Sequence, residues 1–223
     1  MKRIIAMLMV VVLVLVGLVN SPPAYSTAEK RSVEIYAASN SDYQTQVANL
    51  FDKGFEQVDV IFTDSADYPS FTKEPADNNE IKQIGPVKTY YVKNVRKAAD
   101  YVGKSRIASA DGPPGVKISI EETKSVSSTV SGTYSASYSG ISAAVGWNVT
   151  VSTSVAIKGE YDVPYKVGKK KVKRGYLDAY PKYKTKKYDV YYGIKGTSNE
   201  TKKGTGTARK AIGVSYTKYN KYK

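Results

Sequence analysis

The chain has 223 residues, no cysteine and no histidine, and a formal net charge of +14 at pH 7. This composition excludes disulfides, cysteine nucleophiles and Ser–His catalytic pairs, and it removes the commonest imidazole metal ligand. The large excess of positive charge predicts an anionic partner.

The N-terminus has the pattern of an export signal. Lys2 and Arg3 precede an apolar run over residues 4–19, and small-residue cleavage motifs follow at residues 24–28. The run is shorter than the roughly 20 residues of a spanning helix, so an uncleaved anchor is the weaker alternative. We expect residues 1–28 to be a signal peptide cleaved near residues 26–28, which makes the mature protein secreted, either extracellular or in the cell envelope. Export without disulfides fits a Gram-positive-type bacterium.

Residues 29–112 are expected to form an N-terminal α+β part. Short apolar or alternating runs predict strands, at residues 32–38, 58–62, 87–92 and 104–108. Apolar residues at helical spacing predict one short helix over residues 41–55. The polar segment 63–80 is typical of a loop, and its carboxylates do not have the spacing of a calcium loop, so no metal site is predicted. The turn at residues 111–115 ends this part.

Residues 113–223 are expected to form an antiparallel β domain that begins with a long hairpin at 117–158. Polar and apolar residues alternate strictly along both arms, and the phase reverses at Ser139-Gly140. Such a reversal predicts a tight turn at these two residues. The register that follows places Ser127 opposite Ser152, and it makes apolar residues face apolar residues along the whole hairpin.

The central stretch of this hairpin, residues 125–157, contains no charged side chain. One interpretation is an ordinary hairpin with one face on a soluble core. The other is a hairpin that enters a membrane, since each arm exceeds the 9–11 residues of a spanning strand and has one apolar face. The apolar face of the second interpretation consists of Val126, Val130, Tyr134, Tyr138, Ile141, Val145, Trp147, Val149 and Val151. Insertion requires an oligomer, because two strands alone leave unpaired edges in lipid.

Residues 159–223 are predicted to form a basic sheet rich in Lys and Tyr. Its strands are expected at residues 171–180, ended by Pro181, at residues 186–194, and at residues 211–217 after a polar loop. Residues 158–223 hold 17 Lys and 2 Arg against 5 acidic residues, so they account for the whole net charge of +14.

Interleaved lysines and tyrosines suit an anionic interface. The residues expected to bind it are Lys169, Lys170, Lys171, Lys173, Arg174, Lys182, Lys184, Lys186, Lys187, Tyr183 and Tyr188. A membrane or an anionic wall polymer is the expected partner. Nucleic acid is disfavoured, because the chain is exported and has no nucleic-acid-binding motif. The alternative is a solvated basic sheet with structural tyrosines and lysine-protected edges.

The charge-free, Ser/Thr-rich hairpin, followed by Tyr161-Asp162-Val163-Pro164, resembles the insertion region of aerolysin-like β-pore-forming proteins of the epsilon-toxin and mosquitocidal-toxin branch. The resemblance covers about residues 117–180, and the chain is also similar to small exported proteins of Gram-positive bacteria. It implies secretion, binding to a cell surface, oligomerisation and insertion of one hairpin from each subunit.

The sequence therefore predicts a mostly β fold of antiparallel sheets or a β-sandwich, with a long amphipathic hairpin and one short N-terminal helix. The expected function is non-enzymatic and requires no cofactor. It is action at an anionic membrane, with pore formation by the hairpin. The alternative is a cell-envelope binding or structural protein, held on anionic wall polymer by the basic sheet.

Overall fold

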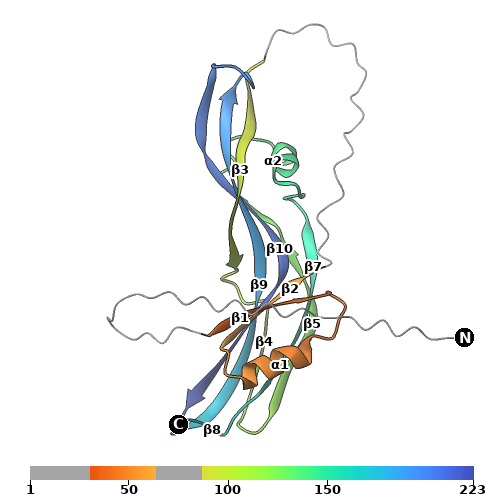
Figure 1. Cartoon of the computed structure of the whole chain (residues 1–223), viewed down its shortest axis with the longest axis vertical. Helices are drawn as coiled ribbons and strands as arrows, with labels where there is room; N and C mark the ends of the chain where they lie inside the picture. The colour runs from red at the N-terminus through yellow and green to blue at the C-terminus, as the bar shows by residue number, and fades with distance from the viewer. Residues whose placement is uncertain (1–30, 64–86) are drawn as a thin grey trace, which may run out of the picture.

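The computed structural model describes residues 31–63 and 87–223. The expected signal peptide and most of the expected loop at 63–80 lie outside these residues. The molecule is elongated, because two very long paired strands, β9 (Lys170–Gly193) and β10 (Glu200–Tyr222), run along its whole length (Figure 1). The C-terminus lies at the lower end in this view, and the turn between β9 and β10 lies at the upper end.

The other elements pack around this pair. In chain order they are β1 (Ser32–Ala37), α1 (Gln44–Asp52), β2 (Gln57–Phe62), β3 (Thr89–Val102), β4 (Ala108–Gly112), β5 (Lys117–Ser127), β6 (Thr129–Ser131), α2 (Tyr138–Val145), β7 (Ser152–Asp162) and β8 (Lys166–Val167). The expected mostly β fold and the short N-terminal helix, α1, are confirmed. A second helix, α2, was not expected.

The main sheet has the order β1-β2-β10-β9-β3. β4 and β8 also pair with β9, and β6 pairs with β10. A separate two-stranded antiparallel sheet consists of β5 and β7. All these pairs are antiparallel except β1–β2, which is parallel, so the main sheet is mixed. Strands from before and after residue 112 share this sheet.

The expected end of a strand at Pro181 is wrong, because β9 continues through it. Proline lacks a backbone N–H, which normally interrupts a central strand. Here β4 pairs with β9 up to Ala179 and β3 pairs with it from Lys182 onward, so Pro181 lies where one neighbour replaces the other. Its carbonyl oxygen still accepts a hydrogen bond of 2.8 Å from the backbone N–H of Gly103. The residue that lacks a backbone N–H therefore lies between the segments of β9 that pair with β4 and with β3.

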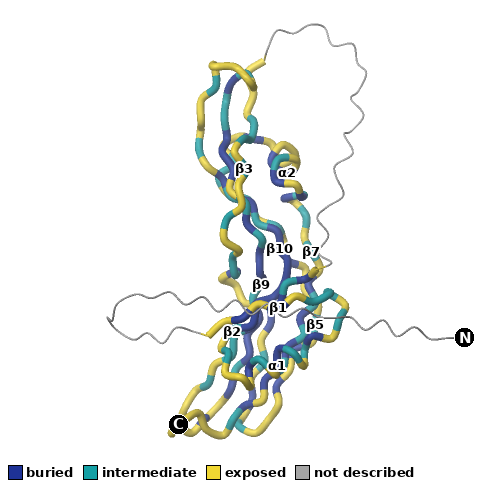
Figure 2. The backbone as a smooth tube through the Cα atoms, viewed as in Figure 1, coloured by how far each residue is buried: buried dark blue, intermediate teal, exposed yellow. Residues whose placement is uncertain are grey.

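The main hydrophobic core lies in the lower half of the molecule. There the β5–β7 sheet and α1 cover one face of the main sheet, and Val155, Ile157, Leu177 and Tyr216 are buried together. Figure 2 shows the buried positions following β9 and β10 from this core toward the upper end. A second, smaller core lies higher, beneath α2. We call the lower part of the molecule, which contains the main core, the base. We call the upper part of β3, β9 and β10, which carries the smaller core, the arm.

The long hairpin is correct in its register and wrong in its length. β5 and β7 pair from Lys117–Asp162 to Ser127–Ser152, in the register that the alternation predicts. Beyond one further backbone bond, from the N–H of Ser128 to the carbonyl oxygen of Val151, residues 128–151 leave this ladder, and there is no tight turn at Ser139-Gly140. They form β6, a turn, α2 and a returning loop. We call residues 128–151 the cap.

Candidate functional site

The cap folds back onto the arm instead of extending the ladder. Its first part, β6, pairs with β10, where Val130 lies opposite Ala208. The chain then turns into α2, whose N-terminus is capped by Ser137: the backbone N–H of Gly140 donates to its hydroxyl at 3.1 Å. Gly146 ends the helix in the left-handed conformation, with φ of 83°. A loop then leads back to β7 (Figure 1).

Apolar side chains hold the cap on the arm. The buried members of this small core are Ala136, Ile141, Val145, Trp147 and Val149 from the cap and Tyr188, Val190 and Ala208 from the arm. Val92, Val95 and Val130 are half-buried against them. This core is separate from the main one, so the cap has its own source of hydrophobic stabilisation.

A few polar contacts add to this packing. The Lys186 ammonium donates to the carbonyl oxygen of Val145 at 2.8 Å and lies 5.1 Å from the centre of the Trp147 ring. The Tyr188 hydroxyl donates to the carbonyl oxygen of Ser131 at 3.2 Å. Burial, with smaller contributions from Tyr138 and Tyr134, raises the pKa of Tyr188 to about 12. The arm thus binds both the beginning and the end of the cap.

Several features of the cap are energetically unfavourable. Tyr134 and Ser135 have φ values of 46° and 70°, which side chains other than glycine adopt at a cost. The buried Trp147 Nε1–H has no hydrogen-bond partner among the described residues. α2 is only 8 residues long, well below the length at which helices are stable alone. The cap therefore depends on its small core and is the natural candidate for local opening.

The residues expected to face a membrane lie in several environments. Val126 is buried in the main core, on β5. Ile141, Val145, Trp147 and Val149 are buried in the small core, and Val130 and Val151 are half-buried. Tyr134 and Tyr138 are exposed, at 45% and 55%. They do not form one apolar face in this structure, because the cap folds as a helix and loop rather than as two strands.

The expected anionic-surface residues are also divided. Lys169, Lys170, Lys171, Lys173 and Arg174 are exposed around the turn between β8 and β9, and Lys187 is exposed on the arm. Lys184 and Lys186 are half-buried. Tyr183 and Tyr188 are buried, and Lys182 is buried in ion pairs with Asp59 at 2.5 Å and Glu34 at 3.0 Å. Strand pairing separates these residues, so they do not form one continuous basic surface.

The exposed basic residues at 169–174, which we call the lysine turn, lie far from the cap. β8 and the start of β9 are at the lower end of the molecule in Figure 1, whereas α2 is in the upper part. The β5–β7 ladder ends at Ser127–Ser152, on the side of the cap. An extension of this ladder would point away from the turn at residues 169–174. The lysine turn and the cap therefore cannot contact a flat surface together in this conformation.

The upper end of the arm carries a different group of aromatic and basic residues, which we call the tip. It comprises Tyr90, Tyr91 and Lys93 of β3, Tyr191 and Tyr192 of β9, and Lys202 and Lys203 of β10. The Tyr90 and Tyr192 rings are 4.7 Å apart, and the Lys203 ammonium lies 5.6 Å from the centre of the Tyr192 ring. Tyr90 is 38% exposed. Sequence reasoning missed the tip because β3 is distant in the chain from β9 and β10.

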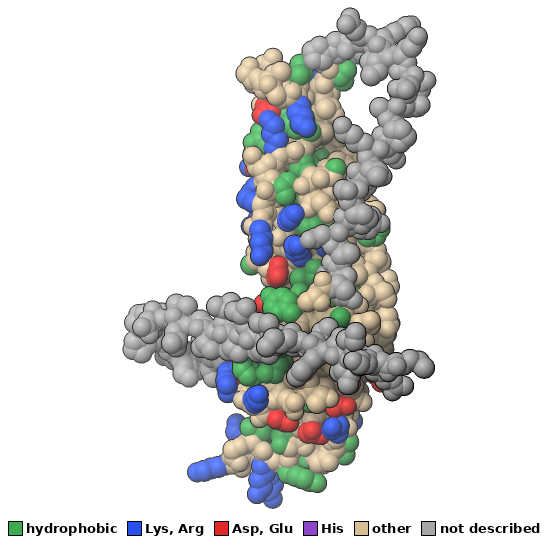
Figure 3. Space-filling view, turned by 45° about the vertical axis from the view of Figure 1, so that its right-hand side comes forward, with side chains coloured by type: hydrophobic (Ala, Val, Ile, Leu, Met, Phe, Trp, Pro, Cys, Tyr) green, Lys and Arg blue, Asp and Glu red, His purple; other side chains and the backbone are tan. Residues whose placement is uncertain are grey.

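Ion pairs order the tip. Glu200 accepts from Lys93 at 2.5 Å and also from the Tyr91 hydroxyl, and both contacts lower the pKa of this carboxyl. The Lys93 ammonium lies 5.5 Å and 5.4 Å from the centres of the Tyr91 and Tyr191 rings. In Figure 3, Lys and Arg side chains gather along one side of the upper body, beside a flank that is mostly uncharged.

The part of the chain that the structure describes gives no sign of a metal site or of a membrane-spanning helix. Among residues 31–63 and 87–223 no three His, Cys, Asp or Glu side chains are grouped as a metal site would require. No helix in these two ranges combines the length and the apolar character needed to cross a bilayer. No protein-family model matches the chain, and no curated protein matches it either.

Proposed function

We propose that this chain is a secreted, non-enzymatic protein that docks on an anionic membrane and inserts the charge-free residues 125–157 as a β-hairpin. The observation that carries the proposal is the relation between the β5–β7 ladder and the cap. The ladder follows the alternation of the sequence as far as Ser127–Ser152, and the alternation resumes in the cap, with exceptions at Ser128 and Ala144 and a reversal of phase at Ser139-Gly140.

The cap sequence is therefore compatible with two folds. In one it is the helix and loop described above, packed on the arm. In the other, the ladder continues in its existing register and brings Val130 opposite Val149 and Tyr138 opposite Ile141. No residue of β5 or β7 has to change its partner, so the ladder is a template for the extended hairpin. Each strand of the extended hairpin is then long enough to cross the hydrocarbon core of a bilayer.

The absence of charge in residues 125–157 favours such a change. A charged side chain on the lipid face costs about 2–4 kcal/mol at the bilayer centre, whereas hydroxyl groups can line a polar lumen. The extended hairpin has mostly apolar residues on one face and mostly Ser or Thr on the other. Several copies have to combine, because an isolated hairpin leaves backbone groups unpaired in lipid. The product is a homo-oligomeric barrel.

The tip is the proposed docking surface. Tyrosine rings and lysine ammonium groups together suit the headgroup region of an anionic membrane. The tip lies at the same end of the molecule as the cap, so binding there brings the end of the ladder toward the bilayer. The lysine turn at residues 169–174 lies at the other end and is not part of this docking surface.

Two cysteine pairs test the proposal, since the natural chain contains no cysteine. Val130→Cys with Ala208→Cys links β6 to β10, and directly opposed residues of antiparallel strands have the Cα separation that a disulfide needs. This link holds the cap on the arm. Ser127→Cys with Ser152→Cys links two residues that stay partners in both folds. The second pair is the matched control.

Release of a dye from phosphatidylglycerol vesicles is the measurement. We expect release by the natural chain and by the oxidised Ser127/Ser152 variant. The oxidised Val130/Ala208 variant should release no dye and should regain activity after reduction. Release by the oxidised Val130/Ala208 variant as strong as that by the oxidised Ser127/Ser152 variant would show that release does not require the cap to leave the arm, and would contradict insertion.

The exposed lysine turn favours a second candidate function. Lys169, Lys170, Lys171 and Lys173 lie together at the end opposite the cap, where they can bind an anionic wall polymer without any refolding. This envelope-binding function predicts co-sedimentation with cell walls that is lost in high salt. Intact vesicles, together with wall binding that Lys→Gln changes at these positions abolish, would favour it over insertion.

A further inference from the structure

The lower end of the molecule, away from the cap, gathers large side chains that are exposed to solvent. The turn before β5, the turn between β8 and β9, and the end of β10 meet there. Gly115 donates its backbone N–H to the carbonyl oxygen of Val163 at 2.8 Å, and Lys223 donates to that of Lys171 at 3.0 Å. The exposed side chains include Val116, Tyr165, Val167 and Tyr222, whose exposed fractions lie between 41% and 71%. We call these four residues, together with the lysine turn, the foot.

The turns hold the foot in a fixed shape. The Tyr165 ring packs on Gly115, where any side chain would collide with it. Val172 donates its backbone N–H to the carbonyl oxygen of Tyr165 at 2.9 Å, and the Lys170 ammonium lies 5.4 Å from the centre of the Tyr222 ring. These side chains are thus exposed and yet already ordered, which reduces the entropic cost of binding.

Basic side chains surround these residues and project from the lower end in Figure 3. The exposed ones are Lys166, Lys169, Lys170, Lys171, Lys173, Arg174, Lys221 and Lys223. Arg174 forms an ion pair with Asp111, whereas the lysines have no carboxylate partner among residues 31–63 and 87–223. Lysines around protruding tyrosine and valine side chains are typical of a surface that enters the headgroup region of an anionic bilayer. A soluble polyanion needs only the lysines, so the exposed valines favour lipid.

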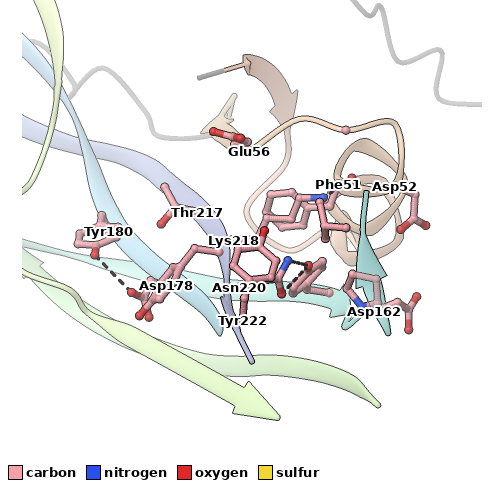
Figure 4. Close-up of a pocket in the computed structure, with 15 residues that line it drawn as sticks. Phe51, Asp52, Glu56, Asp162, Asp178, Tyr180, Thr217, Lys218, Asn220 and Tyr222 are labelled. Carbon is pink, nitrogen blue, oxygen red and sulfur yellow. Dashed lines mark hydrogen bonds between the residues drawn. The ribbon is translucent and has the colours of Figure 1, made fainter. Parts of the chain in front are cut away.

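Carboxylates lie on the body of the molecule beside the foot. They line a cavity of about 640 Å³, and Figure 4 shows Asp52, Glu56, Asp162 and Asp178 around it. Asp178 is buried and bound to Arg106 at 3.1 Å, but the other three are exposed. Anionic lipid repels negative charge at this level. The extreme end of the base, rather than its side, is therefore the part that fits a bilayer.

The foot and the tip lie at opposite ends of the β9–β10 pair (Figure 1). A strand rises about 3.3 Å per residue, so the 24 residues of β9 separate the two surfaces by roughly 75 Å. This is several times the Debye length of about 8 Å at physiological ionic strength. Two negatively charged membranes held at this distance do not repel each other appreciably.

We propose that the foot is a second membrane-docking surface, and that one molecule joins two anionic bilayers, one at each end. The foot is argued from its own residues, whereas the bridging rests on the proposed function for the docking of the tip. Neither surface includes a residue of the cap, so bridging requires no refolding.

Aggregation of phosphatidylglycerol vesicles, followed by turbidity, tests the proposal. We expect the natural chain to aggregate them, and the oxidised Val130/Ala208 variant to do so equally, because its cap is held. Tyr165→Ser with Val167→Ser keeps every charge and should abolish aggregation while dye release is unchanged. Tyr36→Ser, at a residue of β1 that is 47% exposed and lies at neither end, is the matched control and should aggregate vesicles normally.

Three results would overturn the proposal. The first is protein that sediments with the vesicles without aggregating them, since the molecule then uses one surface only. The second is aggregation that Tyr165→Ser with Val167→Ser leaves unchanged. The third is absent aggregation together with binding of this double variant to isolated cell walls, which would assign the lysines to wall polymer. Aggregation without dye release would support bridging and contradict insertion, so the two failures are distinguishable.

Discussion

Ser127 and Ser152 are the last residue pair of the β5–β7 ladder, and their hydroxyl oxygens lie 3.0 Å apart. One more backbone bond, from the N–H of Ser128 to the carbonyl oxygen of Val151, measures 3.0 Å. Beyond this bond the two segments separate. Residues 129–131 pair with β10, whereas residues 146–151 form the loop that comes from the end of α2. The boundary between a stable ladder and a weakly held cap therefore lies at a pair of small hydroxyl residues, with no turn or proline to force it.

The first prediction concerns the independence of the cap. Ile141 in the small core and Ile157 in the main core are both 0% exposed. Replacing a buried isoleucine by alanine typically costs about 2–5 kcal/mol. We expect Ile141→Ala to open the cap locally, with faster amide exchange at residues 138–149 and unchanged exchange in β5 and β7. Fluorescence of Trp147, the only tryptophan, should shift to the red.

Ile157→Ala is the matched control for this change. It removes the same atoms from the main core and should lower the free energy of unfolding of the whole molecule. Equal effects of the two variants on every amide would show that cap and base unfold as one unit, and would remove the basis for local opening.

The register of the ladder was predictable from the sequence, and the cap was not. Period-two alternation specifies which residues face each other, and this local rule held for β5 and β7. Ile141 and Val145 are two strand repeats apart but also one helical turn apart, so the same residues fit a buried face of either element. The signals for a helix, Ser137 as N-cap and Gly146 as C-cap, are present in the sequence, but each is a single residue. Packing against Tyr188 decides between the two, and that contact is distant in the chain.

The exposure of individual lysines was not predictable either. Lys182 and Lys187 have similar neighbours in the sequence, yet one is buried and the other exposed. The difference is the partner: Asp59 of β2 lies close to Lys182 in the folded sheet. Composition predicts the sign of a surface but cannot identify ion pairs between distant strands.

The second prediction uses the raised pKa of Tyr188. An unfolded tyrosine has a pKa near 10, and burial raises that of Tyr188 to about 12 in the folded protein. The folded state holds this proton more tightly, so its contribution to stability is complete below about pH 10 and is lost as the pH rises toward 12. We expect the urea midpoint of the cap, followed by Trp147 fluorescence, to fall between these values.

Tyr188→Phe should reduce this alkaline dependence, because it removes the titrating group. It should also cost about 1 kcal/mol at neutral pH through loss of the hydrogen bond to Ser131. Tyr165→Phe, at a residue that is 71% exposed, is the control. An alkaline slope that is the same in Tyr188→Phe as in the natural chain would contradict the assignment.

The third prediction concerns acid. Asp189 is buried and accepts hydrogen bonds from Thr205 at 2.7 Å and Lys202 at 2.9 Å, with Asn94 and Arg96 nearby. These contacts hold the pKa of this carboxyl well below its usual range. A lowered pKa contributes stability that is present above the unfolded value, near 4, and is lost as the pH falls below it.

We therefore expect the urea midpoint of the natural chain to decline below pH 4. Asp189→Asn should be less stable at pH 7 and should show a shallower decline in acid. Asp162→Asn, at an exposed position, should keep the acid dependence of the natural chain. If Asp189→Asn retained the full acid dependence, the carboxyl responsible would have to lie elsewhere.

The fourth prediction concerns the buried pair Lys182–Asp59, whose side chains are 8% and 7% exposed. Breaking a buried ion pair from one side typically costs about 3–5 kcal/mol, because the remaining charge is left without compensation. Lys182→Met should therefore lower the free energy of unfolding by this amount, measured by urea titration. The double change Lys182→Met with Asp59→Leu removes both charges and should recover most of the loss. Glu34, the second partner of Lys182, is 45% exposed and remains solvated in both variants. A double variant no more stable than Lys182→Met alone would show that packing around the lysine, rather than its charge, stabilises the junction of β2, β9 and β10.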